Sequence, residues 1–415
     1  MVARVMIAWE LGGAFGHLAR CLRLAEGLRQ RGHAVTLALK DVRLPAGQCI
    51  GQGFTVLPAP MTPQGVAGHG SPANYADVLL GSGFADAHDV AARLNAWRGM
   101  LSLAQPDVLV ADYAPTAMLA AHLAGIPHLA IGNGFAIPPA VSPWPSIRPW
   151  EEIPEETLRE AEARLNRVTD AAQIAQGHAA TVRMRELFGA DDILDTVAEL
   201  DHYGERRAGR YVGPIVSLPQ ALRVDWQRRE VPKVLAYLRP AVPGFAAILQ
   251  ALARLDADVL CVAPGMNPEA AKRVATRHLR MALTPVDLAP LLEVADLAVG
   301  YGNGGFSTQA LLAGVPLAMR PCNVEQMLLA RRIELLGAGK LLEGRLDADK
   351  ATASMQELLV KPCYRQAANA FRDRHRQFSP SQAMEQSLSL IERTLAGGSR
   401  SNAHETQERP PRCLH

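Results

Sequence analysis

Apolar residues in the first fifty positions alternate between the spacing of a strand and the spacing of a helix. Val5 to Trp9 is a short apolar run, and a glycine-rich turn follows it. Leucine and alanine then recur at helical spacing from position 18 to position 28, whereas Arg20 and the next arginines fall on the opposite, polar face. A second apolar run covers Ala34 to Leu39. Because a helix joins the two runs, the pattern predicts a βαβ unit and a parallel sheet.

The same alternation recurs further along the chain. Asp107 to Ala111 and His128 to Ile131 are expected strands, separated by a helix from Ala117 to Ala124. A polar helical region is expected from about Pro154 to Leu187. In the second half the expected strands are Val234–Leu238, Val259–Val262, Leu297–Val299 and Pro316–Met319, and the expected helices are Phe245–Leu255, Pro268–His278, Gly305–Ala313, Val324–Leu336, Tyr364–Phe378 and Gln382–Leu395.

The chain length fits two domains better than one. With 415 residues, the chain exceeds the size at which a single hydrophobic core stops growing. Each half repeats the strand–helix alternation, so we expect an α/β protein with two doubly wound, Rossmann-like parallel sheets facing across a cleft, a common place for ligands. The expected divisions are a first domain at 1–215, a linker at 216–230, a second domain at 231–362, C-terminal helices at 363–396 and a disordered tail at 397–415. Pro58 to Ser82 is expected to form a long irregular loop.

Composition and charge exclude several classes of protein. Hydrophobic residues make up 48% of the chain and the formal net charge is +2, so a nucleic-acid partner is not indicated. The six cysteines lie far apart and form no CxxC pair, which predicts neither a zinc site nor a disulfide framework. Glu10 interrupts the apolar N-terminus, and no run approaches the ~20 apolar residues needed to span a bilayer. We therefore expect a cytoplasmic protein with at most peripheral membrane contact.

The segment from Leu297 to Pro316 carries the strongest chemical signal. A buried strand is expected to end there in a glycine-rich turn, after which a helix begins. Glycine lets the backbone approach a ligand closely, and the unpaired N–H groups of a first helical turn lie at the positive end of the helix dipole. These features are typical of a diphosphate cradle, although a plain strand–turn–helix connection has the same pattern. The cradle residues are expected to be Gly302, Asn303, Gly304, Gly305, Ser307 and Thr308.

The order of residues around this turn resembles the donor-site signature of a known enzyme family. The usual signature is His-Gly-Gly-x-Gly-Thr-x-x-Glu-Ala-Leu, then Gly-Val-Pro, then Pro and Asp-Gln. This chain matches it at Ala310, Leu311, Gly314, Val315, Pro316 and Pro321. The family comprises GT-B glycosyltransferases that use nucleotide sugars and includes the UDP-glucuronosyl, plant and antibiotic-modifying enzymes. The resemblance, close over residues 284–340 and loose over most of the chain, implies that Gln309 binds ribose and that Glu325 and Gln326 bind sugar hydroxyls. It also implies that the C-terminal helices at 363–396 cross back to the first domain.

The chain departs from the family signature at its first position. The family usually has a histidine there that contacts the diphosphate, and Tyr301 occupies that place. A tyrosine hydroxyl donates a hydrogen bond but brings no cation. The missing charge is expected from Arg239, just past the first strand of the second half, or from Arg320, although a solvated surface arginine is an equal alternative for each. The resemblance also places Pro285 and Val286 in a loop whose backbone flanks the nucleotide base.

His17 follows Gly16 in the turn after the first strand. The resemblance implies that this histidine deprotonates the acceptor hydroxyl and that Asp112, which follows another strand, pairs with it. An alcohol is a poor nucleophile at neutral pH, imidazole titrates nearby, and a carboxylate orients the ring. Taken singly, a helix N-terminal contact for His17 and a helix cap for Asp112 are equal alternatives. Residues expected on the acceptor side are Gly13, Phe15, Gly16 and Phe135, with weaker cases for His69 and His88.

The sequence thus predicts an inverting glycosyltransferase that moves a sugar from a UDP- or dTDP-sugar to an acceptor hydroxyl or similar nucleophile. No metal and no further cofactor is expected, because a helix dipole can stabilise the leaving diphosphate. The acceptor is a small molecule, lipid or glycan. The spacing of Gly12, Gly13 and Gly16 does not give GxGxxG, which disfavours a nicotinamide or flavin enzyme. Two alternatives stay open: a nucleotide-sugar epimerase of the same architecture, and an inactive nucleotide-sugar- or glycan-binding protein.

Overall fold

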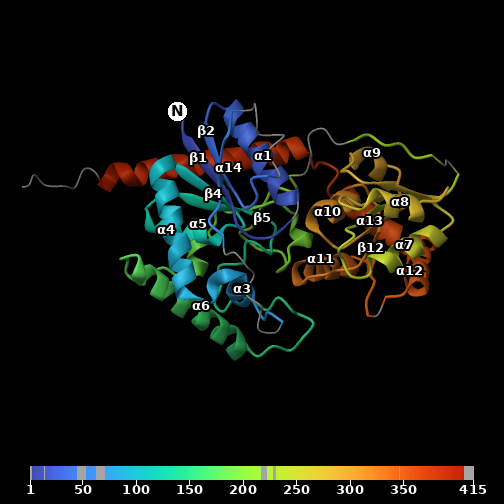
Figure 1. Ribbon diagram of the computed structural model, residues 1–415, viewed down its shortest axis with the longest axis horizontal. Helices are drawn as coiled ribbons and strands as arrows, with labels where there is room; N and C mark the ends of the chain where they lie inside the picture. Colours follow the sequence, from blue (N-terminus) through green and yellow to red (C-terminus); the bar gives the residue numbers. More distant parts are fainter. Residues whose placement is uncertain are drawn as a thin grey trace, which may run out of the picture. The chain divides into compact units, whose positions relative to one another are not determined.

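The structure of the protein is a computed structural model that describes residues 2–13, 15–43, 53–61, 71–215, 222–227, 230–344 and 346–405. The chain divides into two compact units. The first unit contains residues 1–197, 205–215 and the segment from Pro380 onward, and the second contains residues 198–204 and 216–379. Each unit has its own sheet with helices on its faces (Figure 1).

Within the described residues, the first unit holds a seven-stranded sheet in the order β3-β2-β1-β4-β5-β6-β7. Its strands are β1 Arg4–Trp9, β2 Ala34–Leu39, β3 Thr55–Pro58, β4 Val108–Asp112, β5 His128–Gly132, β6 Ile193–Leu194 and β7 Arg210–Tyr211. All pairings are parallel, and Trp9 lies beside Asp112 in the register of β1 and β4. The chain leaves β1 toward β2 and leaves β4 toward β5, so the strand order reverses between β1 and β4. Ligands of such sheets bind outside the carboxyl ends of the strands at this switch point.

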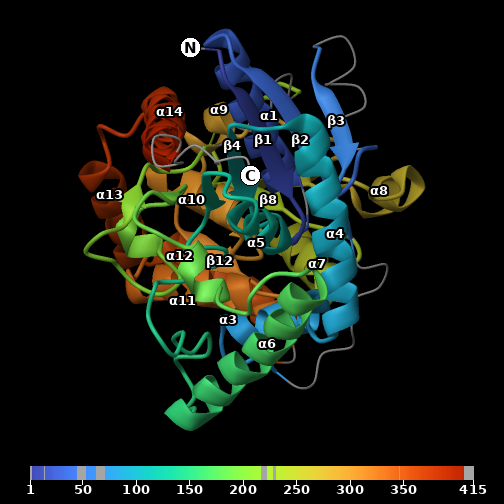
Figure 2. The same cartoon turned by 90° about the vertical axis from the view of Figure 1, so that its left-hand side faces the viewer.

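Helices of the first unit pack in two groups. They are α1 Phe15–Gln30, α3 Tyr75–Leu79, α4 Ala87–Ala104, α5 Pro115–Leu123, α6 Glu155–Ala175 and α14 Pro380–Glu405. α1 packs against α14, which also contacts β4 and β5, whereas α4 packs against α5 and α6 (Figures 1 and 2). Because crossovers between parallel strands are right-handed, α1 and α5 lie on opposite faces of the sheet. A Cβ on Gly27 of α1 would lie 2.8 Å from a Leu388 methyl of α14, which shows how closely these helices pack.

The second unit repeats this architecture with a six-stranded parallel sheet, β10-β9-β8-β11-β12-β13, within the described residues. Its strands are β8 Lys233–Tyr237, β9 Asp258–Val262, β10 Leu279–Ala282, β11 Leu297–Gly300, β12 Leu317–Met319 and β13 Gly339–Leu341, and its helices are α7 Phe245–Arg254, α8 Pro268–Val274, α9 Ala289–Leu292, α10 Gly304–Leu312, α11 Val324–Leu335, α12 Ala348–Val360 and α13 Pro362–Arg374. Here the strand order reverses between β8 and β11.

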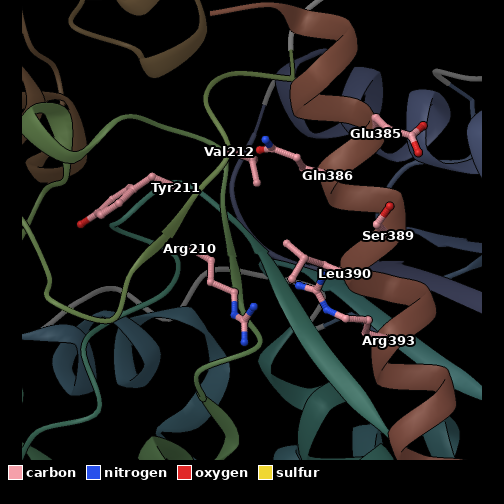
Figure 3. Close-up of a pocket in the computed structure, with 8 residues that line it drawn as sticks. All are labelled: Arg210, Tyr211, Val212, Glu385, Gln386, Ser389, Leu390 and Arg393. Atoms are coloured by element: carbon pink, nitrogen blue, oxygen red, sulfur yellow. The ribbon is translucent and has the colours of Figure 1, made fainter.

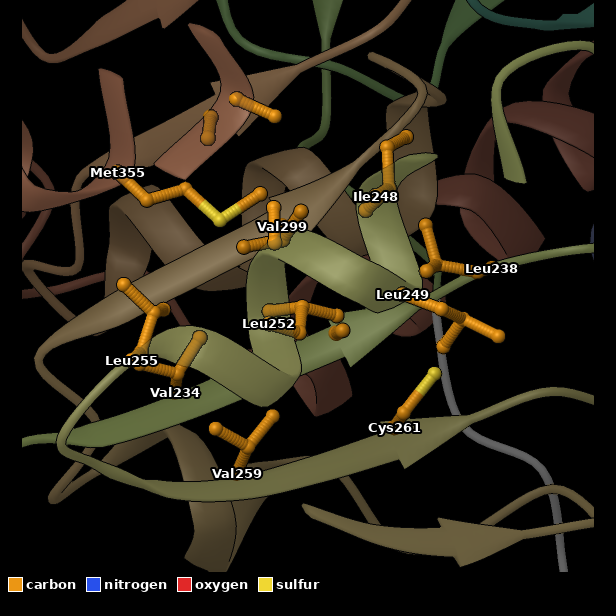
Figure 4. Close-up of a cluster of buried hydrophobic side chains, with 14 of the residues drawn as sticks. Val234, Leu238, Ile248, Leu249, Leu252, Leu255, Val259, Cys261, Val299 and Met355 are labelled. Atoms are coloured by element: carbon orange, nitrogen blue, oxygen red, sulfur yellow. The ribbon is translucent and has the colours of Figure 1, made fainter. Parts of the chain in front are cut away.

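The core of the second unit forms where α7 covers its sheet. Ile248 and Leu252 of α7 pack with Val234 of β8, Val259 of β9 and Met355 of α12 (Figure 4). Each of these five side chains is fully buried. Burial of such a side chain contributes roughly 1.5–3 kcal/mol, an upper bound when compared with a compact unfolded chain. β8 and β11 also pair in parallel, with Val299 beside Ala236, so their carboxyl ends lie side by side.

The predicted α/β class with two doubly wound parallel sheets is confirmed. The expectation of a long irregular loop from Pro58 to Ser82 is wrong in part, because this segment contains the helix α3. Asn74 caps α3 by accepting from the N–H groups of Ala76 and Asp77. Residues 62–70 lie outside the described residues. The single helical region expected from about Pro154 to Leu187 is divided, because α6 ends at Ala175 and a short 3-10 helix covers Met184–Leu187. A disordered tail was expected from position 397, whereas α14 continues to Glu405.

The two compact units agree with the expected divisions at α14 and differ from them elsewhere. α14 belongs to the first unit, as expected of a C-terminal helix that crosses back, whereas α13 and residues 198–204 belong to the second unit. Most of the expected linker, residues 216–221 and 228–229, lies outside the described residues.

Among the helices that the structure describes, none has the length and apolar character needed to cross a membrane.

Candidate active site

His17 and Asp112 are hydrogen-bonded at the switch point of the first unit. His17 lies in the first turn of α1, Asp112 is the last residue of β4, and His17 Nδ1 is 2.7 Å from Asp112 Oδ1. An ionised carboxylate only accepts hydrogen bonds, so the neutral imidazole carries its hydrogen on Nδ1 and keeps a lone pair on Nε2. Asp112 does not cap α5, because the N-cap residue of that helix is Ala114. The pair therefore presents Nε2 as a proton acceptor.

The surroundings of the His17 ring fix its orientation. The Trp9 indole stacks on it with 5.6 Å between ring centroids and 13° between planes. Gly12 has a φ of +75°, and a Cβ there would lie 2.5 Å from His17 Nε2, so this position requires glycine. Tyr113 also has a positive φ, of 50°, and its carbonyl accepts a hydrogen bond of 2.9 Å from the N–H of Leu11. That bond stabilises the strained turn after β4.

Arg20 is buried beside this pair, so its expected place on the solvent face of the helix is wrong. Only 8% of its surface is exposed. Its Nε donates to Asp112 Oδ2 and its Nη2 to Asp112 Oδ1, both at 2.8 Å. Its Nη1 forms an ion pair with Asp195, the residue after β6. Arg20 comes one helical turn after His17, and that spacing places both side chains on one face of α1.

The charges in this cluster shift one another's protonation. Burial alone would raise the pKa of Asp112, but Arg20 and His17 hold it at about 2. Burial alone would lower the pKa of Arg20, yet the carboxylates of Asp112 and Asp195 keep it well above its usual range. Burial raises the pKa of Asp195 in spite of its contact with Arg20. Asp112 is therefore ionised near neutral pH and able to accept from His17.

Glu10 is a second buried carboxyl group near the end of β1. Its oxygens accept hydrogen bonds from the indole N–H of Trp97 and from the backbone N–H groups of Thr116 and Ala117, at the start of α5. Burial raises the pKa of Glu10 to about 7. The carboxyl group thus satisfies N–H groups that a helix start leaves unpaired. The sequence showed Glu10 only as an interruption of an apolar run, which gives no sign of this role.

The residues expected on the acceptor side differ in exposure. Gly13 and Gly16 are exposed, whereas Phe135 is buried. Phe135 packs edge-on against Tyr75 and Tyr113, with ring centroids 6.3 and 6.5 Å away. Phe135 therefore belongs to an aromatic cluster that supports the turn after β4. Of the remaining candidates, His88 is exposed on α4, whereas the Phe15 side chain and all of His69 lie outside the described residues.

The predicted diphosphate cradle lies between β11 and α10 in the second unit. Gly302 has a φ of +79°, and a Cβ there would lie 2.8 Å from the carbonyl oxygen of Gln326 on α11. Asn303 is the N-cap residue but makes no side-chain capping bond, so the first N–H groups of α10 stay available to a ligand. The Asn303 Oδ1 and Ser307 Oγ atoms are buried without a hydrogen-bond partner. A buried hydroxyl of this kind can donate to an anion, and Thr308 is also buried, whereas Gly305 is exposed.

Tyr301 is placed differently from the expected diphosphate ligand. Its hydroxyl accepts from the backbone N–H of Arg239 at 3.0 Å and donates to the carbonyl of Arg239 at 3.1 Å. A phenol has one hydrogen to donate, so no donor remains for a phosphate. Only 4% of Tyr301 is exposed, and burial raises its pKa to about 12. Tyr301 therefore fixes the turn after β8, where the Arg239 side chain is exposed.

The other expected donor-site residues have local partners. Gln309 donates to the carbonyl of Gly305 at 3.0 Å, and Gln326 accepts from the N–H of Cys322 at 2.9 Å. Arg320 donates to the carbonyl of Leu342 at 2.6 Å. Glu325 and Gln326 lie in the first turn of α11, half-buried. The carbonyl of Pro285 accepts from Leu222, and the side chain of Val286 is buried.

A small cavity of about 280 Å³ lies elsewhere in the first unit, between β7 and α14 (Figure 3). Arg210 and Val212 line it from one side, and Leu390 and Arg393 line it from the other. Its lining contains none of the residues that the sequence proposed as a site. The cavity is therefore separate from the His17 cluster.

Comparisons with known proteins agree with this arrangement. Residues 246–389 match the family described as "Erythromycin biosynthesis protein CIII-like, C-terminal domain". The PGL/p-HBAD biosynthesis glycosyltransferase of Mycobacterium tuberculosis is 28% identical over 305 residues, which are 65% of this chain and 67% of that protein. The NDP-glycosyltransferase YjiC of Bacillus subtilis is 24% identical over 380 residues, or 84% of this chain and 89% of that protein.

Solved structures share the fold at lower identity. The calicheamicin glycosyltransferase CalG4 has a TM-score of 0.70 and 19% identity, covering 94% of this chain and 99% of its own. The glycosyltransferase VinC, solved in complex with dTDP, has a TM-score of 0.67 and 19% identity, covering 94% and 100%. The two parallel-sheet units and these matches identify the chain as a glycosyltransferase with the GT-B fold, and the similar solved structures include an enzyme that modifies calicheamicin.

Proposed function

We propose that the chain transfers a sugar from a nucleoside diphosphate sugar to an acceptor hydroxyl, with inversion and with His17 as the base. The hydrogen bond of 2.7 Å between His17 Nδ1 and Asp112 Oδ1 carries this proposal, because it leaves Nε2 to accept a proton. Asp112, with a pKa of about 2, remains a carboxylate and stabilises the imidazolium that forms. The acceptor oxygen then attacks the anomeric carbon as the diphosphate leaves from the opposite face, and a single displacement inverts that carbon.

The leaving diphosphate is assigned to the start of α10. The free N–H groups at a helix N-terminus and its dipole favour an anion, by up to about 2 kcal/mol in a partly buried position. The Ser307 hydroxyl, buried without a partner, is a further donor beside them. The exposed Arg239 side chain supplies the charge that the family obtains from a histidine. Because these groups can stabilise the developing charge, we propose that transfer needs no metal ion.

A thymidine diphosphate sugar is the first donor to test, with UDP-sugars second. VinC was solved with dTDP, and the spinosyn rhamnosyltransferase SpnG was solved with thymidine diphosphate and with spinosyn aglycone. By analogy we propose a small-molecule aglycone as the acceptor. A thermal-shift panel of dTDP- and UDP-sugars identifies the nucleotide, because a ligand at 100 times its Kd stabilises the folded state by about 2.7 kcal/mol.

The proposed function is tested by release of nucleoside diphosphate in the presence of an acceptor panel, with EDTA in a parallel series. We expect His17→Ala to lower kcat by about 10²- to 10⁴-fold, because general-base catalysis contributes on that scale. His178→Ala is the matched control, since His178 lies in the turn after α6. Unchanged transfer by His17→Ala would show that His17 is not the base. Donor binding without turnover would indicate an inactive binding protein, and interconversion of the free donor would indicate an epimerase.

A further inference from the structure

A continuous series of buried charges extends behind His17. Arg20 makes a two-point contact with Asp112 through Nε and Nη2, and its remaining nitrogen contacts Asp195. The side chains of Asp112 and Asp195 are 0% and 8% exposed. The three residues come from α1, from the end of β4 and from the segment after β6. Folding therefore brings together charges from three separate parts of the first unit.

The net charge of the cluster depends on Asp195. Asp112 and Arg20 alone would form a neutral pair, and a proton on His17 would then leave a net positive charge in a buried site. Burial raises the pKa of Asp195, but its ion pair with Arg20 opposes that rise and favours the carboxylate. With Asp195 ionised, the three residues carry one negative charge, and protonation of His17 brings the cluster to neutrality. Charge separation in a poorly solvated site is expensive, so the second arrangement stabilises protonated His17 better than the first.

Arg20 also fixes the direction of the Asp112 carboxylate. Both oxygens of Asp112 accept from the guanidinium in a fork geometry, which leaves Oδ1 aimed at His17 Nδ1. Such a two-point contact requires the planar guanidinium, since an ammonium group is a point charge. Rotation of the carboxylate away from His17 would break both contacts with Arg20.

We propose that Arg20 and Asp195 are positioning residues for the His17 base: Arg20 orients Asp112, and Asp195 supplies the negative charge that lets His17 accept a proton. The expected effect on catalysis rests on the function proposed above, whereas the electrostatic coupling of Arg20, Asp195 and Asp112 to His17 does not. Two further contacts fall within the cluster: Arg20 Nη2 lies 3.3 Å from His17 Nδ1, and the Cys21 thiol lies 3.7 Å from Asp112 Oδ2. Lys40 and Glu10 have partners outside it, because Lys40 donates to the carbonyl of Gly12 at 2.7 Å and Glu10 accepts from the start of α5.

The decisive variant is Asp195→Asn, which keeps the shape of the side chain and removes its charge. We expect kcat/KM to fall by about 10- to 100-fold, by analogy with the loss caused when a hydrogen-bond partner of a metal-bound histidine is removed. We also expect the acid limb of the pH–rate profile to move to lower pH, because protonated His17 loses stabilisation. Asp191→Asn is the matched control, since Asp191 pairs with Arg210 at the surface. A merely structural role for Asp195 would lower the amount of folded enzyme without moving the acid limb.

A second measurement does not depend on activity. In protein labelled with ¹⁵N-histidine, the His17 signals are assigned by their loss in His17→Gln, and the pH midpoint of their titration is recorded. Asp195→Asn should move this midpoint to lower pH, and Asp191→Asn should leave it in place. If Asp195→Asn does not fold, Arg20→Lys replaces it: it keeps the charge but loses the fork, so the rate should fall with little movement of the acid limb.

The outcomes separate this proposal from the proposed function. If the native protein transfers sugar but Asp195→Asn keeps both its rate and its pH profile, the positioning role is wrong. If the native protein transfers no sugar from any donor, the proposed function fails, and the His17 titration alone decides whether Asp195 is linked to the imidazole. A midpoint that stays unchanged in Asp195→Asn would overturn the proposal in either case.

Discussion

Removal of the Tyr301 hydroxyl tests the reassignment of this residue from ligand to structural support. In Tyr301→Phe the ring keeps its place in the apolar core, while the backbone of Arg239 loses both contacts with the hydroxyl. The Arg239 carbonyl still accepts from the N–H of Val242 at 3.1 Å. The main loss is therefore the acceptor for the Arg239 N–H, together with one of two donors to its carbonyl.

The expected size of this loss follows from those contacts. A hydrogen bond contributes about 0.5–1.5 kcal/mol net to stability, and a buried donor without a partner costs about 1–3 kcal/mol. Since Arg239 is an exposed residue, water can reach part of its backbone, and we expect a destabilisation of about 1–2 kcal/mol. The same change loosens the turn that positions the Arg239 side chain. We therefore also expect the donor Kd to rise by about three- to tenfold, which corresponds to about 0.7–1.4 kcal/mol.

The assay is urea unfolding of the transition that involves the second unit, combined with calorimetric titration of the donor. Tyr364→Phe is the control, because its hydroxyl donates to Glu357 at 3.1 Å near the surface and its loss should change stability by less than about 0.5 kcal/mol. A midpoint for Tyr301→Phe equal to that of the native protein, at an unchanged slope, would refute the reasoning. Loss of donor binding with no loss of stability would instead return Tyr301 to the role of direct ligand.

Three further predictions follow from close contacts and from burial. Gly12→Ala places a Cβ 2.5 Å from His17 Nε2 and should abolish transfer, whereas Gly99→Ala, with open space around it, should not. Equal rates in the two variants would contradict the placement of the His17 ring. Gly302→Ala meets the carbonyl of Gln326 at 2.8 Å, with a left-handed φ that costs about 1–2 kcal/mol, so the thermal shift with donor should disappear. Burial raises the pKa of Glu10 from 4.5 to about 7, so its contribution to stability is full below about pH 4.5 and is lost as the pH rises through about 7. Glu10→Gln should therefore reduce the fall in melting temperature between about pH 5 and about pH 8, because it removes a loss of at most about 3 kcal/mol of stability. It should not abolish the fall, because burial also raises the pKa of Asp192 from 3.8 to about 7, and an unchanged slope would exclude the effect.

The strands and the helices around them were predictable because their apolar residues are local signals. The run from Val234 to Leu238 nearly coincides with β8, and Ala34 to Leu39 coincides with β2. Short strands gave no such signal: β6 has two residues, Ile193 and Leu194, and its pairing with β5 depends on contacts that are distant in sequence. Asp195 directly follows β6, so its part in the cluster was hidden for the same reason.

Arg20 shows the limit of assigning faces by residue type. Helical spacing placed it among charged residues, and charged residues are seldom fully buried unless they are paired. The partner that makes its burial possible, Asp112, is 92 positions away. The useful local signal was its distance of three residues from His17, because side chains at that spacing share a helix face.

The two candidate sites occupy equivalent places in their units, and this explains why some of their residues were found and others were misassigned. His17 and Asp112 lie where β1 meets β4, and Tyr301 joins the ends of β8 and β11 by bonding to Arg239. Strand order alone directs attention to the carboxyl ends of these four strands. It does not say whether a group there faces a ligand or the neighbouring strand. At the first switch point Asp112 bonds to Nδ1 of His17, so Nε2 of the same ring can still accept a proton. At the second, both hydrogen-bonding functions of the Tyr301 hydroxyl go to the backbone of Arg239, so the contact supports the turn, and the proposed interaction with the diphosphate falls to the helix start and the Arg239 side chain.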